Sequence, residues 1–442
     1  MRPQQTQTGP RGGADGLLKE HYRGLLEETR ERTLWLVSTI SLDDLERVHT
    51  PLLSPLVWDL GHIAAFEDLW LCQQAGGLPA LRGDLADIYD ATLTPRADRG
   101  DLSYLPNDEA RAFMEDVRRR ALDVLEAADM SEDTDPLTAR GFVWEMIVRH
   151  EQQHNETMLQ ALRMAESGVF VPHPRPLPAP PFGSFGPDMV RVDGGEFILG
   201  ADDEGFAYDN ERPRHERHLP AFEIDRLPVT NGDFAKFVEG GGYHRREWWS
   251  DAGWAWREAE GIELPLFWTA DGEQRHFDRT TPLDPKRPVM HVSWFEADAY
   301  ARSVGKRLPT EEEWEKAAAW DAPAGEARRY PWGDDEPSDH HANLDQTSFG
   351  PARAGAYPQG VSPCGAMGMV GDAWEWTASD FEAYPGFRAF PYSEYSAIFF
   401  SDSYKVLRGG SWATRPRVAS TTFRNWDYPQ RRQIFSGFRC AA

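Results

Sequence analysis

Residues 141–166, GFVWEMIVRHEQQHNETMLQALRMAE, carry the pattern that decides the fold of the N-terminal part of this 442-residue chain. Apolar residues recur there at spacings near 3.6, which predicts an amphipathic helix. His150 and His154 stand four positions apart, so both imidazoles project from the same helix face, about 6 Å from each other. Such a pair can bind one metal ion.

The same periodicity recurs in three segments upstream, which together with 141–166 predict a four-helix bundle over residues 15–168. These segments are LLKEHYRGLLEETRERTLWLVS (17–38), PLVWDLGHIAAFEDLWLCQQ (55–74) and NDEARAFMEDVRRRALDVLEAA (107–128). Bundles commonly build metal sites from side chains on facing helices. His62, which we place near the start of its helix in DLGHIAAFED, is the candidate third ligand.

Two other interpretations of the histidine pair stay open. The string HEQQH also matches the HExxH motif of zinc proteases, in which Glu151 would be a general base and a third ligand would follow downstream. Alternatively, the polar neighbours mark a solvated helix face: Arg149, Glu151, Gln152 and Asn155. Three imidazoles suit zinc, iron, nickel or copper alike, but three protein ligands leave open positions, which is typical of catalytic sites.

Composition changes at GVFVPHPRPLPAPPFGSFGPD (168–188), whose prolines cannot continue a helix, so we expect a proline-rich linker over 169–188. Beyond it, residues 189–442 read as an α+β domain with short strands and helices at about 294–304 and 310–320. The strand-like runs are MVRVDGGEFILG, HLPAFEIDRLPVT and YKVLRGGSWA. Residues 1–14 are polar and rich in glycine and proline, which predicts a flexible N-terminus.

Bulk properties narrow the class of protein. With 47 Lys and Arg against 72 Asp and Glu, the formal charge of −25 repels nucleic acid and anionic lipid. No apolar run approaches the ~20 residues of a membrane span, and the N-terminus lacks the apolar core of a secretory signal. The three cysteines are far apart and odd in number. We therefore expect a cytoplasmic protein, monomeric, with no nucleic-acid or membrane partner.

Particular strings resemble two known families. DLGHIAAFED followed by RHEQQHNETML resembles the DinB-type bundle that forms the N-terminal part of ergothioneine-pathway sulfoxide synthases. The second half resembles the formylglycine-generating-enzyme (sulfatase-modifying factor) domain, which has a C-type-lectin-like fold. The matching strings are VRVDGGEFILG, FEIDRLPVTNGDFAKFV, RPVMHVSWFEADAYARSVGKRLPTEEEWEKAA, YPWGD, AMGMVGDAWEWTASDF, VLRGGSW and GFRCA. The cysteine pair of the formylglycine-generating enzyme is missing after GGS, so we do not expect copper–thiolate chemistry.

The resemblance to the synthases implies an activity. Iron(II) held by His62, His150 and His154 would use O2 to join the imidazole C2 of hercynine to the thiol of γ-glutamylcysteine, giving a sulfoxide in ergothioneine biosynthesis. Cysteine as the donor, a selenoneine synthase with a selenium donor, a DinB-type metal-dependent thiol transferase and a ligand-binding module without catalysis are the alternatives.

The resemblance also assigns residues to the substrates. Gln153 would hydrogen-bond the hercynine ring, and Trp426 would face its quaternary ammonium through a cation–π contact. Arg96 and Arg99, in YDATLTPRADRG, would bind the donor's carboxylates, because guanidinium groups bind carboxylates in a bidentate manner. Asp427 and Arg431, in NWDYPQRR, would complete the donor pocket.

A tyrosine of the second domain is expected to donate a proton or an electron near the oxygen site. Tyr384 is our choice over Tyr392 and Tyr395. Asn343 and Asp345, in HANLDQTSF, could supply oxygen ligands to a structural calcium ion, although both residue types are also common in turns.

Overall fold

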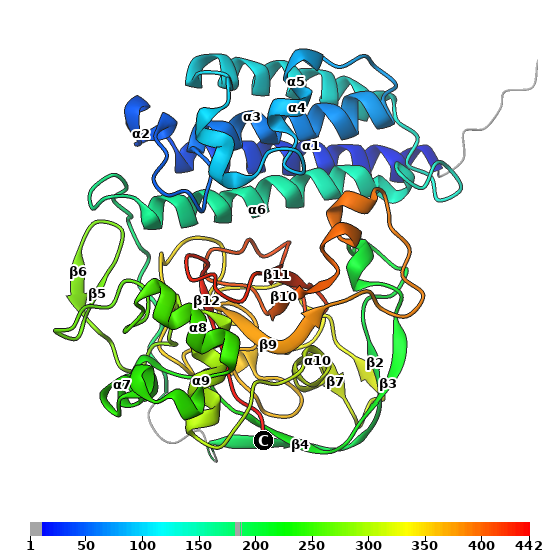
Figure 1. Cartoon of the computed structure of the whole chain (residues 1–442). Coiled ribbons are helices and arrows are strands. Elements are labelled where there is room, and N and C mark those ends of the chain that lie inside the picture. The colour runs from blue at the N-terminus through cyan, green and yellow to red at the C-terminus, as the bar shows by residue number, and fades with distance from the viewer. Residues whose placement is uncertain (1–10, 182–185, 187) are drawn as a thin grey trace, which may run out of the picture. The chain divides into compact units, whose positions relative to one another are not determined.

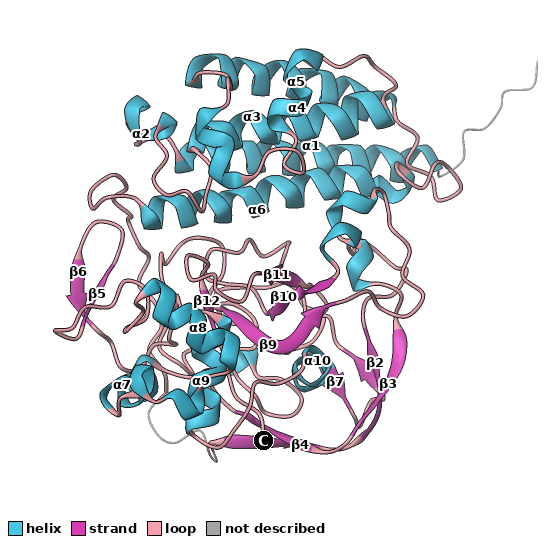
Figure 2. Ribbon diagram, viewed as in Figure 1, coloured by secondary structure: helices cyan, strands magenta, loops and turns pink. Residues whose placement is uncertain are grey.

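The computed structural model describes residues 11–181, 186 and 188–442. The chain divides into two compact units, Met1–Ala165 and Glu166–Ala442. The first unit is built from helices, whereas the strands all belong to the second (Figure 2). This division agrees with the predicted fold class, an all-α bundle followed by an α+β domain.

The helical unit contains the four predicted long helices (Figure 1). They are α1 (Arg11–Leu36), α3 (Leu56–Glu67), α5 (Asn107–Ala127) and α6 (Phe142–Met164), with the short helices α2 (Leu42–Glu46) and α4 (Ala86–Tyr89) between them. We expected residues 1–14 to be flexible, but helix α1 already begins at Arg11. The helix extends this far because adding residues to an existing helix costs little free energy. Residues 1–10 of that segment lie outside the described residues.

Helix α3 is the most enclosed element of the bundle. Residues 56–64 are all buried, so this helix has no polar face turned to solvent. A helix that is apolar all round must be surrounded by others, and α3 contacts both α5 and α6. A π-helical segment, Asp68–Ala75, continues it.

A buried ion-pair network ties the four long helices together. Arg30 of α1 and Arg118 of α5 each bind both Glu67 of α3 and Glu151 of α6, at N–O distances of 2.6–3.2 Å. The two acidic side chains are at most 1% exposed. Because two cations face two anions, the network is neutral as a whole, and burying it does not leave an uncompensated charge.

The proline-rich segment after α6 has no regular secondary structure where it is described, as its prolines predict. It is nevertheless held against the C-terminal unit. Phe170 packs against Phe277 and Phe349, and the backbone N–H of Arg175 donates to the carbonyl of Thr347 at 2.8 Å. The described part of this segment therefore belongs to the second compact unit.

The C-terminal unit is organised around a four-stranded sheet in the order β11-β10-β9-β12, antiparallel except for the β9–β12 pair. Two-stranded sheets pair β1 with β4, β2 with β3, β5 with β6 and β7 with β8. The strands are β1 (Met189–Val192), β2 (Gly195–Leu199), β3 (His215–Leu219), β4 (Phe222–Asp225), β5 (Glu273–Arg275), β6 (Thr280–Pro282), β7 (Trp320–Asp321), β8 (Glu326–Ala327), β9 (Trp374–Phe381), β10 (Ser401–Arg408), β11 (Asn425–Asp427) and β12 (Ser436–Gly437).

Both predicted helices of this unit are confirmed as α9 (Trp294–Ser303) and α10 (Glu311–Ala319). Each begins with a capping box, with Ser293 and Thr310 as the N-cap residues. Two further helices, α7 (Asn231–Glu239) and α8 (Asp251–Glu260), were not predicted from the sequence. Both are short and contain glycine, so their helical periodicity is weak, although each has a Ser or Thr N-cap.

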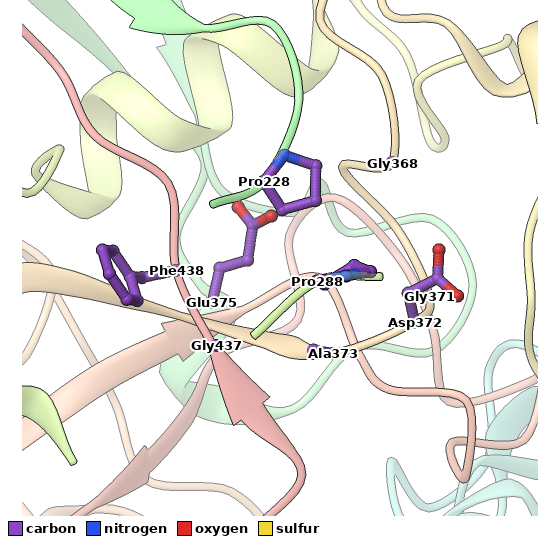
Figure 3. A pocket seen from close by; sticks show the side chains of 9 residues that line it. All are labelled: Pro228, Pro288, Gly368, Gly371, Asp372, Ala373, Glu375, Gly437 and Phe438. Carbon is purple, nitrogen blue, oxygen red and sulfur yellow. The ribbon is translucent and has the colours of Figure 1, made fainter. Parts of the chain in front are cut away.

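The interior of the C-terminal unit also contains satisfied ion pairs. Arg439 binds Glu375 of β9 through two hydrogen bonds of 2.7 and 2.8 Å, and the indole of Trp314 donates to the same carboxylate at 2.7 Å. Glu375 lines the small pocket of Figure 3. Its carboxylate is thus already bound within the protein core.

Across the described residues, the helices are all too short or too polar to span a lipid bilayer.

Candidate metal centre

Three histidines come together inside the helical unit. His62 of α3 meets His150 and His154 of α6, and one ligand nitrogen from each lies within 4.8 Å of the other two. The Nε2 atoms of His62 and His150 are 3.2 Å apart. The structure therefore brings together the three predicted ligands. We had expected His62 near the start of its helix, but it lies in the middle of α3.

His62 is oriented by the backbone of a neighbouring element. Its Nδ1–H donates to the carbonyl oxygen of Tyr89 at 2.7 Å, so Nε2 carries the lone pair that faces the other two histidines. The ring of Trp58, one turn earlier on α3, stacks on the imidazole at 4.9 Å between centroids. The tautomer and the plane of His62 are thus both set by the protein.

His154 is oriented by a carboxylate. Its Nδ1 lies 3.0 Å from Oδ1 of Asp59, which is only 1% exposed. A metal-binding histidine commonly donates its other ring N–H to such a group. His150 is held by the ring of Phe66, which stacks on it at 3.8 Å and 15°. Each of the three imidazoles therefore has its own support.

The electrostatics of the cluster favour a bound cation. Burial lowers the pKa of His62 and of His150 well below the ordinary value, and the proximity of His154 lowers both further. These two imidazoles are therefore neutral near pH 7, the state that binds metals. Two imidazole nitrogens bound to one ion at about 2.1 Å lie about 3 Å apart, close to the observed Nε2–Nε2 distance. The donor set fits a divalent transition metal.

Glu151 does not take part in this cluster. Its carboxylate accepts hydrogen bonds from Arg30, Thr33 and Arg118, in the ion-pair network on another face of α6. Burial would raise the pKa of Glu151, but Arg30 and Arg118 outweigh it and hold this pKa below the ordinary value. A general base needs a free carboxylate near the metal. The described geometry therefore does not support the HExxH interpretation.

The other predicted residues of the helical unit lie close to the histidines in sequence or space. Gln153 immediately precedes His154 on α6 and is half-buried. Arg99 is 6% exposed and its guanidinium lies 3.8 Å above the ring of Trp58, the residue that stacks on His62. Arg96 is half-buried in the same 3-10 segment as Arg99.

Arg99 is a buried cation that has no carboxylate within ion-pair distance among the described residues. Its guanidinium donates to Ser54 Oγ and to the carbonyls of Thr94 and Ala91, at 2.8–3.4 Å. Burial, with Arg96 nearby, lowers the pKa of Arg99 to about 10, so the group stays charged at neutral pH. Asp59 is near enough to attract this charge but forms no ion pair with it. A desolvated, charged guanidinium that no carboxylate binds directly is a candidate binding site for an anion.

In the C-terminal unit, Trp426 of β11 belongs to an aromatic cluster. Its indole stacks on Phe381 at 4.1 Å and 8°, and the rings of Tyr395 and Phe399 lie at 5.9 and 5.5 Å. Asp427 follows it and forms an ion pair with Arg431 at 3.5 Å. The structure thus groups Trp426, Asp427 and Arg431 on one short segment.

The three tyrosine candidates have different surroundings. Tyr384 is 6% exposed and packs with Phe197 and Leu199, and its buried hydroxyl has no hydrogen-bond partner in the described structure. Burial raises the pKa of Tyr384 well above the ordinary value. The ring of Tyr395 contacts that of Trp426 and stacks on that of Tyr208, with 4.3 Å between the centroids of the stacked pair. The ring of Tyr392 lies 6.2 Å from that of Tyr395, centroid to centroid.

Asn343 and Asp345, which we considered from the sequence as calcium ligands, both have partners within the protein. The Asn343 side chain accepts from Ser348 at 2.8 Å and donates to Asp372 at 2.8 Å. Asp345 forms an ion pair with Arg415 at 2.7 Å. Calcium needs several oxygen ligands, and a calcium ion at these two residues stays a prediction from the sequence.

The residues that sequence reasoning missed are those that support the ligands: Trp58, Asp59, Phe66 and Tyr89. Three of them share α3 with His62, at offsets of three or four residues that place them on adjoining helix faces. That spacing is a signal that could have pointed to them. Tyr89 acts through its backbone carbonyl and leaves no such signal.

Comparison with known proteins agrees with this architecture. The DinB superfamily profile matches residues 25–158, and that of the sulfatase-modifying factor enzyme 1-like domain matches residues 178–442. The formylglycine-generating enzyme of Thermomonospora curvata is 33% identical over 300 residues, 58% of this chain and 93% of that protein. That similarity is confined to little more than half of this chain.

Other relatives, among them two hercynine oxygenases, match nearly the whole chain. The hercynine oxygenase of Mycolicibacterium thermoresistibile is 47% identical over 434 residues, 94% of this chain and 93% of that protein. The hercynine oxygenase of Mycobacterium tuberculosis is 47% identical over 425 residues, 94% of this chain and 97% of that protein. Because these relatives match over nearly the full length of both domains, this protein belongs to the hercynine oxygenase family of enzymes.

Proposed function

We propose that this enzyme joins hercynine to the thiol of γ-glutamylcysteine with O2, giving a sulfoxide conjugate in ergothioneine biosynthesis. A C–H bond at the imidazole C2 and an S–H bond are lost, a C–S and an S=O bond form, and the second oxygen atom leaves as water. O2 accepts four electrons, two for the new C–S bond and two for the sulfoxide. The observation that carries this proposal is the cluster of His62, His150 and His154 in a chain of this family.

We assign iron(II) to the three histidines. Bound iron would supply the one-electron redox chemistry that couples O2 reduction to C–S bond formation. The chain would supply three imidazole nitrogen donors and leave the remaining positions open to substrates. His150 and His154 are half-buried, whereas His62 is buried, so a substrate would reach the cluster past the two histidines of α6.

Hercynine binding is assigned to Gln153 and Trp426. Gln153 is next to His154 in sequence and half-buried, so its amide can reach a ring that approaches the open positions. Trp426 is also half-buried, and its stacking on Phe381 fixes the plane of an indole face that can receive a quaternary ammonium.

The thiol donor is assigned to Arg96, Arg99, Asp427 and Arg431. Support comes from Arg99, whose buried guanidinium forms no ion pair with a carboxylate in the described part of the chain. A donor with two carboxylates would use more cations than cysteine, which has one. This difference favours γ-glutamylcysteine over cysteine.

Tyr384 is assigned as the proton donor. Its raised pKa keeps the phenol protonated at neutral pH. Its ring lies 4.2 Å below the guanidinium of Arg424, which also covers Phe381, the residue stacked on Trp426. Tyr395 is the alternative proton donor, because its ring contacts Trp426 directly.

A cytoplasmic location and a monomeric state are also part of this proposal.

The test is reconstitution with iron(II) without oxygen, followed by hercynine, a donor and O2. Separate arms receive γ-glutamylcysteine, cysteine and a selenosugar. The expected product has the mass of hercynine plus γ-glutamylcysteine plus one oxygen atom, less two hydrogens, and ¹⁸O2 labels it. A thioether formed without O2 consumption would replace this proposal with a thiol transferase. Product from the selenium donor alone would indicate a selenoneine synthase.

The same assay with Tyr384→Phe, Tyr392→Phe and Tyr395→Phe identifies the proton donor. We expect Tyr384→Phe to lower sulfoxide formation and shift the product towards other oxidation outcomes, with the two other variants close to wild type. If Tyr395→Phe has this effect and Tyr384→Phe does not, the assignment moves to Tyr395.

A further inference from the structure

Helix α3 contributes more to the metal centre than its single ligand. Along it, Trp58 stacks on His62, Asp59 binds His154, and Phe66 stacks on His150. Asp59, His62 and Phe66 stand at positions i, i+3 and i+7, and Trp58 is four residues before His62. These offsets lie along adjoining faces of one helix, so one rigid element contacts all three imidazoles.

We propose that α3 is the positioning helix of the metal centre and that Asp59 is the positioning residue for His154. This inference rests on the metal centre of the proposed function but not on the identity of the thiol donor. Asp59 accepts the Nδ1–H of His154 and thereby directs Nε2 toward the other two histidines. Without this acceptor, the ring could adopt the other tautomer or rotate.

The burial and hydrogen bonding of Asp59 agree with a role in positioning His154 better than with a role in stabilising the fold. Its side chain is 1% exposed, and its Oδ2 atom has no hydrogen-bond partner among the described residues. A buried carboxylate oxygen without a partner costs free energy. Attraction to the charge of Arg99 offsets this cost in part in the metal-free protein, and a cation bound by His154 would add a second attraction.

Gly61 extends the same arrangement to His62. A Cβ atom at this position would lie 2.2 Å from the ring of Tyr89, so glycine allows that ring to pack directly on α3. The hydroxyl of Tyr89 accepts the N–H of Leu105 at 2.9 Å, which fixes the other end of the ring. The Tyr89 carbonyl is thereby held where it accepts from His62.

The experiment measures cobalt(II) and iron(II) affinity by competition with a chromophoric chelator, in the full-length protein. The variant is Asp59→Asn, which removes the charge but keeps the size of the side chain. The matched control is Asp108→Asn, an exposed aspartate in the first turn of α5. Phe66→Leu, at a half-buried site, is the second variant. Urea unfolding of each metal-free protein reports folding, and the visible spectrum of bound cobalt reports ligand geometry.

We expect Asp59→Asn to bind cobalt about 10- to 100-fold more weakly than Asp108→Asn. Its metal-free urea midpoint should be unchanged or higher, and its cobalt spectrum altered. Phe66→Leu should weaken binding less and change the spectrum in the same way. Equal affinities for both aspartate variants, with unchanged spectra, would overturn the positioning role. Absence of metal binding by the wild type would instead overturn the metal centre and the proposed function.

Discussion

Replacing Glu151 by glutamine tests whether this residue holds the bundle together or acts at the metal. The wild-type carboxylate accepts from Arg30 Nε at 2.8 Å, Arg30 Nη2 at 3.3 Å, Thr33 Oγ1 at 2.7 Å and Arg118 Nη2 at 3.2 Å. Glutamine keeps one acceptor oxygen and turns an N–H₂ donor toward the arginines. The buried network changes from neutral to one excess positive charge.

The size of the effect follows from these contacts. Removing one partner of a buried ion pair costs about 3–5 kcal/mol. Glu67 still binds both arginines, at 2.6–2.7 Å, so we expect the lower end of that range. With a urea dependence of about 2 kcal/mol/M, a loss of about 3 kcal/mol lowers the unfolding midpoint by about 1.5 M.

The assay is urea unfolding followed by circular dichroism, with hydrogen exchange of α1 and α6 peptides to assign the transition to the helical unit. The control is Glu126→Gln, whose ion pair with Arg23 is exposed, and which should cost about 0–1 kcal/mol. Equal midpoints for the two variants would refute the structural role of Glu151. Loss of activity at full stability would instead favour the general-base interpretation.

The pH dependence has a definite sign. The pKa of Glu151 in the folded protein is below its ordinary value of 4.5, so its stabilisation is present above that pH and is lost as the pH falls through the folded-state pKa. The stability difference between wild type and Glu151→Gln should therefore be full at pH 7. It should shrink in acid below about pH 4.5.

Three further predictions concern stability. Burial raises the pKa of Asp372 to about 6, so ionising it opposes folding: stability falls as the pH rises from about 4 to 6. Asp372→Asn should then raise the thermal midpoint at pH 7.5 by a difference that vanishes near pH 4. Gly61→Ala should destabilise metal-free protein in urea, because overlap with Tyr89 (about 1–3 kcal/mol) outweighs the helix propensity of alanine (about 1 kcal/mol). Tyr384→Phe should leave the urea midpoint unchanged or higher, because it removes a buried hydroxyl without a partner; a clear fall would reveal a missing hydrogen bond.

Long, strongly periodic segments were predictable from sequence, and so were the histidines on them. The i, i+4 pair of His150 and His154 needs only helical geometry. The range of α6, and that of α3 together with the π-helical segment that continues it, agree with the predicted ranges within a few residues. Short helices such as α7 and α8 were not predictable, because nine or ten residues with glycine carry too little periodicity. The position of His62 along α3 was also predicted wrongly. The sequence of this helix is mostly apolar and shows little contrast between its faces.

The sequence by itself determined the two-part architecture, the family and the three metal-ligand candidates, since these depend on local periodicity and on strings that can be compared. Only the tertiary structure decided which polar side chains serve the metal and which serve the fold. Glu151 and Asp59 are both acidic residues close in sequence to a histidine ligand. One neutralises two buried arginines, and the other faces His154 with an oxygen left unpaired. That distinction depends on which partners long-range packing brings within hydrogen-bond distance, and no local pattern encodes it.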